Sequence, residues 1–283
     1  MNLTNKRIIV AGEICQDEYI YTKRGEKSPE HPNIDILKVK KIEEKDGMST
    51  NVVKNLESIG ALPILISNNK KNSIIKKTRL LIDEKHVFRI DDDEYKKQFS
   101  DTEIRNQIVD TTKHCLVEGL IIQDYGNKFW NKTLCQEIIS AVSQPVFVDP
   151  YPTSDLSWYR GCEVITPNLK EIRKLTGEED VEEAMHQLLN ITQAFACVTT
   201  LGDKGMVVME QNRRYPTFIE AENVPVVDVC GAGDTVIAVI AYLYLHGMDI
   251  TECARIANRA ASLTIQTSGV SSINRDQLLK LVL

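Results

Sequence analysis

A glycine turn followed by an acid is the clearest chemical signal in the chain. Residues 230–234 read CGAGD and lead into an apolar stretch typical of a helix. Glycines allow a tight turn, and the free amides at a helix N-terminus bind anions such as phosphate. We therefore predict an anion hole at Gly231, Ala232 and Gly233, with Asp234 as the base for an attacking hydroxyl. Because a helix N-terminus favours the ionised carboxylate, we expect no elevated pKa for Asp234.

Two better-known glycine motifs are excluded at this turn. Val236 stands where the dinucleotide fingerprint needs its third glycine, and Asp234 and Thr235 stand where a P-loop needs Lys and Ser or Thr. A plain helix cap after a glycine turn would also explain an isolated run of this kind. The rest of the chain must therefore decide between a cap and a site.

Composition predicts one large α/β domain. The chain has 283 residues, of which 42% are hydrophobic and 26% charged, which suits a single core. A net charge of −6 predicts no nucleic-acid partner, and no apolar run approaches the roughly 20 residues of a membrane span. Seven scattered cysteines without a C-x-x-C pair, and no signal-peptide pattern, indicate reduced thiols, no zinc site and a cytoplasmic protein.

The elements that would position the turn alternate along the chain. Strands are predicted at 6–13, 62–67, 119–123, 146–149, 163–166, 196–200, 206–210 and 215–219, and helices at 48–59, 102–115, 131–142, 155–159, 169–175, 181–192, 233–246, 251–267 and 275–282. This alternation predicts a mostly parallel sheet with helices on both faces. Half-exposed strands at 17–24 and 34–42 and a hairpin at 79–90 lack such helices and predict a separate small sheet. The acidic run 91–94 predicts a solvated loop.

Five stretches carry a family resemblance: 8–19, 47–60, 120–125, 148–177 and 227–271. Together they cover most of the chain, and residues 164–171 (VITPNLKE) and the CGAGD run are the most specific. The chain resembles the ribokinase-like (PfkB) carbohydrate kinases, most closely the bacterial D-glycero-β-D-manno-heptose 7-phosphate kinases. The resemblance implies one ribokinase-like domain over 1–283, with lid segments near 17–42 and 78–91. It also implies ATP-dependent phosphorylation of a sugar phosphate to the 1,7-bisphosphate, with no second transferase domain after Leu283.

The resemblance implies cofactors and the residues that bind them. Asn168 and Glu171 match an N-x-x-E motif that holds Mg²⁺ through water, although a helix cap explains the same pair. The neighbourhood of Asp228 is implied to bind a monovalent cation, K⁺. Residues implied to lie beside ATP are Thr200, Gly202, Gly205 and Asn258; the first three also fit a plain hairpin loop, and Asn258 an ordinary helix position.

On the sugar side, the resemblance implies binding by polar groups from the chain's first half and by arginines from the lid hairpin. Arginine suits a phosphate already on the substrate because its fork bonds two oxygens. As isolated residues, the polar groups also fit turns or caps, and the arginines fit a solvated strand. The implied set is Glu13, Asp17, Gly47, Asn51, Arg79, Arg89 and Asp124.

Three departures from the family pattern leave rivals open. Residues 68–77 are too short for the αβ unit that relatives insert there, Tyr151 follows Asp149-Pro150, and Lys128 stands one place later than in the family's D-Y-x-K segment. In addition, Met48 replaces the second glycine of a G-G-x-x-N element. The alternatives are a kinase for another sugar or a nucleoside, or a catalytically silent sugar- or nucleotide-binding protein. Exposed edges of the lid strands need cover, so we expect a homodimer through them.

Overall fold

The computed structural model describes residues 3–67, 75–92, 99–267 and 269–283. Its main sheet, sheet A, has six parallel strands: β1 (Arg7–Gly12), β4 (Leu62–Ile66), β7 (Gly119–Gln123), β8 (Val146–Asp149), β9 (Val164–Ile165) and β10 (Ala196–Thr200). Two antiparallel strands, β11 (Met206–Glu210) and β12 (Thr217–Ile219), extend it. The order is β12-β11-β10-β9-β8-β7-β1-β4, so β4 is an edge strand among the described residues.

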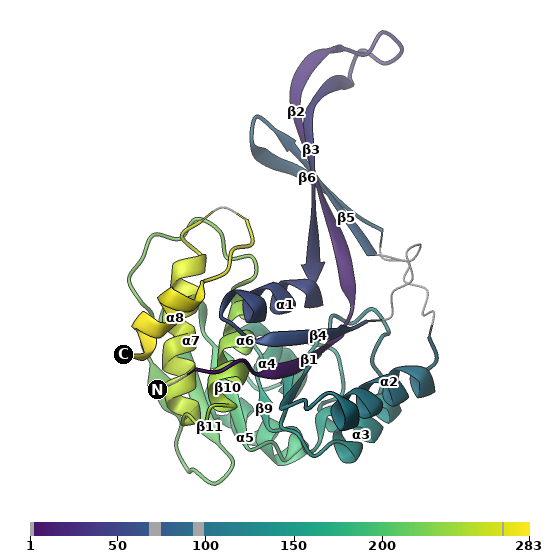
Figure 1. The fold of residues 1–283 in the computed structure, drawn as a ribbon. Helices are drawn as coiled ribbons and strands as arrows, with labels where there is room; N and C mark the ends of the chain where they lie inside the picture. The colour runs from purple at the N-terminus through teal and green to yellow at the C-terminus, as the bar shows by residue number, and fades with distance from the viewer. Residues whose placement is uncertain (1–2, 68–74, 93–98, 268) are drawn as a thin grey trace.

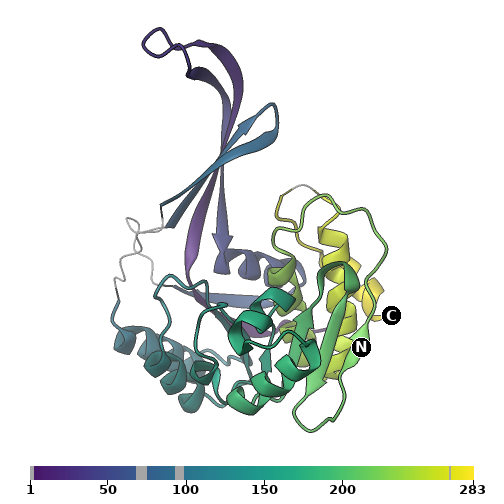
Figure 2. The same ribbon diagram turned by 180° about the vertical axis from the view of Figure 1, so that it is seen from behind.

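Helices cover both faces of sheet A, as the alternation predicts (Figures 1 and 2). Successive residues of a strand point to opposite faces: Ile8 and Val10 join one core cluster, and Ile9 and Ala11 join the other. The first cluster includes residues of α1 (Ser49–Ser58), α6 (Ala232–Tyr244), α7 (Ile250–Thr264) and α8 (Arg275–Val282). The second includes residues of α2 (Asp101–His114), α3 (Lys132–Ala141), α4 (Leu169–Thr176), α5 (Val181–Thr192) and the 3₁₀ helix η1 (Leu156–Tyr159).

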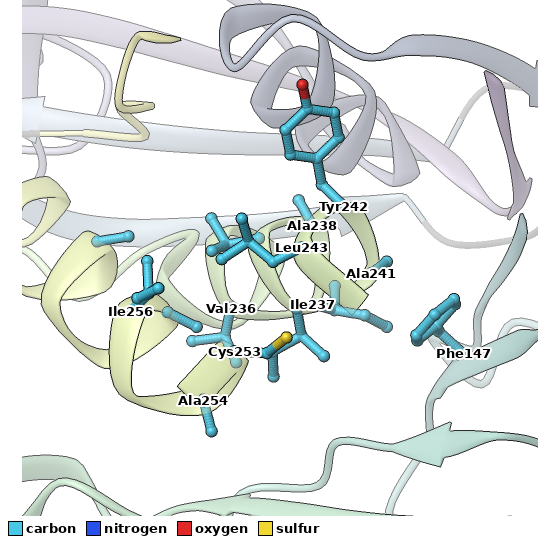
Figure 3. Close-up of a cluster of buried hydrophobic side chains, with 14 of the residues drawn as sticks. Phe147, Val236, Ile237, Ala238, Ala241, Tyr242, Leu243, Cys253, Ala254 and Ile256 are labelled. Atoms are coloured by element: carbon cyan, nitrogen blue, oxygen red, sulfur yellow. The ribbon is translucent and has the colours of Figure 1, made fainter. Parts of the chain in front are cut away.

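Helix α6 is the central helix of its layer. Every residue from Thr235 to Leu243 is buried, which explains why its sequence is apolar on all sides. Figure 3 shows its side chains packed against Cys253, Ala254 and Ile256 of α7, and it shows Phe147 of β8 at the end of the same cluster. This packing fixes the N-terminus of α6, and with it the glycine turn, against the rest of the domain.

Four strands form a second sheet, sheet B, which stands away from the body as an arm (Figure 1). They are β2 (Ile14–Lys27), β3 (Asp35–Met48), β5 (Ile75–Ile82) and β6 (Lys85–Asp92), in the order β3-β2-β5-β6. Only Glu13 separates β1 from β2, and β3 runs directly into α1. The predicted small sheet is therefore present, and it is joined without a linker to β1, the neighbour of the edge strand β4.

The strands of sheet B are longer than the sequence predicts. β2 and β3 have 14 residues each, against the eight or nine expected from 17–24 and 34–42. Asp91 and Asp92 are exposed but belong to β6, so the loop prediction was wrong for them; Asp93 and Glu94 lie outside the described residues. In the shortened segment, residues 68–74 lie outside the described part of the chain, and 75–77 open β5.

The two faces of sheet B differ in chemistry. Cross-strand partners Ile42, Ile20, Leu80 and Phe88 form one apolar row, whose outer members Ile42 and Phe88 are 53% and 67% exposed. On the opposite face the neighbouring rows are polar and rich in cations: Lys45-Asp17-Lys77-Asp91 and Glu43-Tyr19-Arg79-Arg89.

Among the described helices none is long and apolar enough to cross a bilayer.

Candidate active site

Polar side chains gather at the carboxyl edge of sheet A. Glu13 follows β1, Asp124 and Tyr125 follow β7, and Asp149 ends β8. Open parallel sheets bind ligands beyond this edge, where the strand ends and helix starts converge. The N-terminus of α6 reaches the same place, because the hydroxyl of Tyr125 bonds to Asp234 in the first turn of that helix.

Asp234 has two hydrogen-bond donors and an unusual pKa. The Tyr125 hydroxyl donates to its Oδ1 at 3.0 Å, and the side-chain amide of Asn51 also donates to the carboxyl. Burial raises the pKa of Asp234 to about 6, against the lowering effects of the Tyr125 and Asn51 hydrogen bonds and the charge of Lys77. Our expectation of no elevated pKa was wrong, because loss of water around the carboxyl outweighs the helix terminus.

The turn before Asp234 has the form of an anion hole. Gly231 is the N-cap of α6 in the left-handed conformation, with φ 81°, and gives the helix no side-chain cap. The Ala232 amide donates to the Val229 carbonyl at 3.3 Å, so it is partly engaged. Among the described residues no partner is found for the Gly233 amide, and a Cβ at Gly233 would meet nothing within 4 Å. An anion can therefore approach this amide without obstruction.

A cleft of about 630 Å³ lies on the other side of this turn. Its walls are partly apolar, as the sites of aromatic ligands usually are, and Val224, Val226 and Ile265 contribute to them. The structure brings together here most of the residues predicted for the nucleotide, together with part of the anion hole: Thr200, Gly202, Gly205, Asn258, Ala232 and Gly233.

Two of these residues also have structural duties. The Asn258 side-chain amide donates to the Glu220 carbonyl at 2.8 Å and so holds one rim of the cleft. Gly205 has φ 90°, and a Cβ there would lie 2.1 Å from the Ile219 carbonyl oxygen, so only glycine fits beside β12. Both residues help to build the cleft, and a contact with the nucleotide stays a prediction.

Asn168 and Glu171 form a reciprocal helix cap. The Asn168 side chain accepts from the amides of Lys170 and Glu171, while the Glu171 carboxylate accepts from the Asn168 amide at 2.8 Å. The cap interpretation is thus correct, and it does not compete with metal binding because carboxylates have several acceptor sites. Burial raises the pKa of Glu171.

Asp149 is a carboxylate that sequence reasoning left without a role. Burial first, and then the charges of Glu171, Asp234 and Asp124, raise its pKa well above the usual range. Such mutual repulsion marks a place that a cation would stabilise. Within the described ranges, no three His, Cys, Asp or Glu side chains are grouped to hold an ion directly. A magnesium ion would therefore keep several waters, as this metal usually does.

Asp17 and Arg79 face each other on the polar face of sheet B. Arg79 Nη1 donates to Asp17 Oδ1, both side chains are largely buried, and the guanidinium lies 5.1 Å from the centre of the Tyr19 ring. Gly47 makes room for this pair, because a Cβ there would lie 2.3 Å from Asp17 Oδ2. The predicted residues Asp17, Gly47 and Arg79 are therefore brought together.

The polar face of sheet B is oriented toward the glycine turn. The charge of Arg79 acts to lower the pKa of the Cys230 thiol and that of Asp17 to raise it, and the charge of Lys77 acts to lower the pKa of Asp234. Arg89, by contrast, is exposed and binds Asp91 through two hydrogen bonds of 2.6 and 2.8 Å. Lys77 was missed by sequence reasoning, because only the pairing of β5 with β2 places it beside Asp17.

Glu13 and Asp124 hold a loop. Glu13 is fully buried and accepts from the amides of Tyr125 at 3.3 Å and Asn127 at 3.1 Å. Burial, followed by the charge of Asp124, raises the pKa of Glu13 to about 7. Asp124 accepts from the hydroxyls of Ser154 at 2.7 Å and Tyr159 at 2.6 Å. Both carboxyls thus position residues 124–127, and their contact with a substrate stays a prediction.

Asp228 joins two loops beside the anion hole. Its Oδ1 accepts from the Cys230 amide and its Oδ2 from the Gly269 amide, each at 3.0 Å. These amide bonds lower the pKa of Asp228, although burial acts against them. The observed contacts are structural, and a monovalent cation near Asp228 stays a prediction.

Met48 adopts a backbone conformation that side chains rarely tolerate. Its φ is 57° and its ψ −132°, in a region that glycine visits at little cost and other residues do not. The side chain is 6% exposed and packs with Cys15, Ile75 and Tyr125. The methionine therefore forms an apolar wall beside the polar groups of Asp17 and Asn51.

Comparisons with known proteins agree with this geometry. Residues 68–277 match the pfkB family carbohydrate kinases. The bifunctional protein HldE of Nitratiruptor sp. is 30% identical over 304 residues, which cover 96% of this chain and 64% of that protein. HldE of Haemophilus ducreyi is 27% identical over 311 residues, covering 98% and 64%. The chain thus spans slightly less than two thirds of the length of these relatives.

Solved structures share the fold. The ribokinase of Arabidopsis thaliana complexed with ribose and ATP has a TM-score of 0.74 at 19% identity, with 99% of each chain covered. Phosphofructokinase-2 of Escherichia coli in complex with potassium has a TM-score of 0.73 at 15% identity, with 98% of each chain covered. The family match, the fold and the geometry of the glycine turn lead to one assignment. The chain belongs to the pfkB family of carbohydrate kinases.

Proposed function

We propose that Asp234 accepts the proton of a sugar hydroxyl while that oxygen attacks the γ-phosphorus of ATP. The O–H bond breaks toward Asp234, a new O–P bond forms, and the bond from the γ-phosphorus to its bridging oxygen breaks to release ADP. The observation that carries this proposal is the position of Asp234. It sits one residue after the free Gly233 amide, between the cleft and the polar face of sheet B. The base and the anion hole thus lie side by side, as in-line transfer needs.

The nucleotide fits the cleft, with its adenine against the apolar walls near Asn258 and its terminal phosphates at the Gly231–Gly233 turn. Mg²⁺ would be held through water by Glu171, Asn168 and Asp149, and when bound it neutralises charge on the phosphates. The raised pKa values of Asp149 and Glu171 support this placement. For K⁺ we propose the loops that Asp228 joins, in line with the family resemblance.

For the sugar we propose D-glycero-D-manno-heptose 7-phosphate, phosphorylated at its anomeric oxygen. Support comes from the HldE relatives and from three cations on the polar face of sheet B. The charge of Arg79 acts to lower the pKa of the Cys230 thiol, and the charge of Lys77 acts to lower the pKa of Asp234. Lys45 Nζ lies 3.5 Å from the position that a Cβ would take at Gly269. These cations suit a phosphate held opposite the glycine turn. Met48 favours a second candidate, a kinase for another sugar, because its side chain narrows the sugar side of the site.

A turnover screen over sugars and sugar phosphates, with ADP production as the readout, tests this function. Heptose 7-phosphate should give the highest kcat/KM, and Asp234→Asn should lower turnover by roughly 10²–10⁴-fold with nucleotide binding kept. Arg79→Ala should reduce the preference for phosphorylated over free sugar, whereas Arg89→Ala, which loses an exposed pair, serves as the matched control. A wild-type rate in Asp234→Asn would refute the role of Asp234 as the base. A preference for free sugars would refute the heptose assignment alone.

We also propose a homodimer formed through the face of sheet B that carries the apolar row. The row of Ile42, Ile20, Leu80 and Phe88 crosses all four strands and has exposed ends. An exposed apolar strip on a thin arm needs cover, and a second copy offers an equal strip. Light scattering should show a dimer for the wild type and a monomer for Phe88→Lys. A dimer that survives this substitution unchanged would refute the interface.

A further inference from the structure

The loop of residues 124–127 is anchored by two acids, its own Asp124 and Glu13, which follows β1. Glu13 accepts from the amides of Tyr125 and Asn127, and Asp124 accepts from Ser154, Tyr159 and the Gly126 amide. Buried carboxylates that accept several hydrogen bonds hold a backbone tightly. The loop therefore holds the side chain of Tyr125 in a defined position.

Tyr125 lies between the Met48 wall and Asp234. Its ring packs against Cys15, Met48 and Ile75, and its hydroxyl is 3.0 Å from Asp234 Oδ1. Burial, together with the nearby carboxylates, raises the pKa of the Tyr125 phenol well above its usual range. The phenol is therefore a neutral donor at every working pH.

We propose that Tyr125 is a positioning residue for the base: its hydroxyl fixes the Asp234 carboxylate in the orientation that receives the substrate proton. The inference rests on the proposed role of Asp234. A carboxylate on a single rotatable stem loses proton-transfer efficiency when it turns. The hydrogen bond from Tyr125 commits one oxygen and thereby orients the other.

The same hydrogen bond keeps the carboxylate ionised. Four groups from four elements face Asp234: Tyr125 from the loop after β7, Asn51 from α1, Lys77 from β5 and Asp149 from β8. Tyr125, Asn51 and Lys77 favour the charged form, whereas burial opposes it. Without Tyr125, fewer molecules would carry an ionised base near neutral pH.

The test is Tyr125→Phe, with pH profiles of kcat and kcat/KM. The variant keeps the ring that packs on Met48 and loses only the donor. Because a hydrogen bond to a charged group is worth about a factor of ten or more, kcat should fall about tenfold. The acidic limb of the profile should also move up by about one pH unit, while ATP affinity stays unchanged. A profile that overlies the wild type would overturn the inference.

Tyr159→Phe is the matched control. It removes a phenol hydroxyl that supports the same loop through Asp124, and the described contacts give this hydroxyl no bond to Asp234. We expect lower thermal stability in this variant and an unmoved acidic limb. An equal shift in both variants would mean that general loosening of the loop moves the base, and would overturn the specific role of Tyr125.

A second measurement does not depend on turnover. The stability difference between a protein and its Asp234→Asn version changes with pH around the pKa of Asp234. The midpoint should lie higher in the Tyr125→Phe background than in the wild type, and an equal midpoint would overturn the inference. If Asp234→Asn is inactive and Tyr125→Phe leaves both readouts unchanged, the kinase proposal stands and only the role of Tyr125 falls. If Asp234→Asn keeps full turnover, both fall.

Discussion

Replacing Asp234 with asparagine should make the protein more stable at neutral pH while it removes activity. The carboxyl titrates near pH 6 in the folded protein, against a value of 3.8 for an unperturbed aspartate. At about 1.36 kcal/mol per pH unit, this difference corresponds to about 3 kcal/mol. Asp234 is partly accessible to solvent, so we expect about 1–3 kcal/mol. Asparagine has nearly the same shape and keeps an oxygen that can accept from Tyr125.

The sign follows from proton binding. Between pH 3.8 and about 6, folded Asp234 holds a proton that the unfolded chain releases, so wild-type stability falls as pH rises through this window. Below this window the carboxyl is neutral in the folded and the unfolded protein, so it does not change the free energy of unfolding. Above the window the carboxyl is charged in both states, and burial of the charge lowers the free energy of unfolding by its full amount. The stability gain of Asp234→Asn should therefore be near zero at pH 4 and reach its maximum above pH 7.

Thermal melts from pH 4 to pH 8 measure this difference. A gain of about 1–3 kcal/mol should raise Tm by roughly 2–12 °C at pH 8, given about 2–4 °C per kcal/mol for a chain of this size. Asp203→Asn is a matched control, because Asp203 is an aspartate that lines the neighbouring cleft and is exposed; it should change Tm little. An Asp234→Asn protein that melts at or below the wild-type temperature at pH 8 would refute the reasoning, as would a gain independent of pH.

Two further substitutions test the metal and sugar sides of the site. Glu171→Gln keeps an acceptor for the Asn168 amide but loses the charge, so it should raise the Mg²⁺ concentration needed for half-maximal activity; an unchanged metal titration would leave Glu171 as a cap only. Met48→Gly removes the apolar wall and relieves a strained backbone, so kcat/KM for a bulky sugar relative to a small one should rise by about tenfold or more. An unchanged ratio in a sugar panel would show that Met48 does not limit the site.

The body of the fold was predictable because its elements bury whole faces. The strands at 119–123, 146–149, 196–200 and 206–210 and the helix at 181–192 match their predicted bounds. The strands do so because largely buried strands read as short apolar runs. Sheet B was less predictable. β2 and β3 carry polar residues on both faces, with exposed apolar residues such as Ile42 among them. Their ends therefore depend on cross-strand pairing rather than on local pattern.

The site was predictable where a motif is continuous in sequence. Ala232 and Gly233 of the glycine turn line one cleft with Thr200, Gly202, Gly205 and Asn258. Asn168 pairs with Glu171, and the roles of all these residues stay predictions. Lys77 and Asp149 were missed as participants, because their closeness to Asp234 arises only after β5, β8 and α6 are packed. Tyr125 was likewise left unassigned, because nothing local shows that its hydroxyl reaches another element. The prediction for the pKa of Asp234 was wrong for the same reason, since the position at a helix end is a local property and burial is a property of the whole fold.

The length of sheet B means that a small rotation at its junction with sheet A would produce a large displacement at its tip. Two of the connections between the sheets, from β1 to β2 and from β3 to α1, lie side by side here, where the Ser49 amide at the start of α1 donates to the Glu13 carbonyl at 3.0 Å. The 14 residues of β2 make an arm about 45 Å long at about 3.3 Å per residue. A turn of about 5° at the junction would move the tip by about 4 Å over such a length. If two copies pair through their arms, a small rotation of sheet B near Asp17 in one subunit would become a larger displacement at the neighbouring subunit.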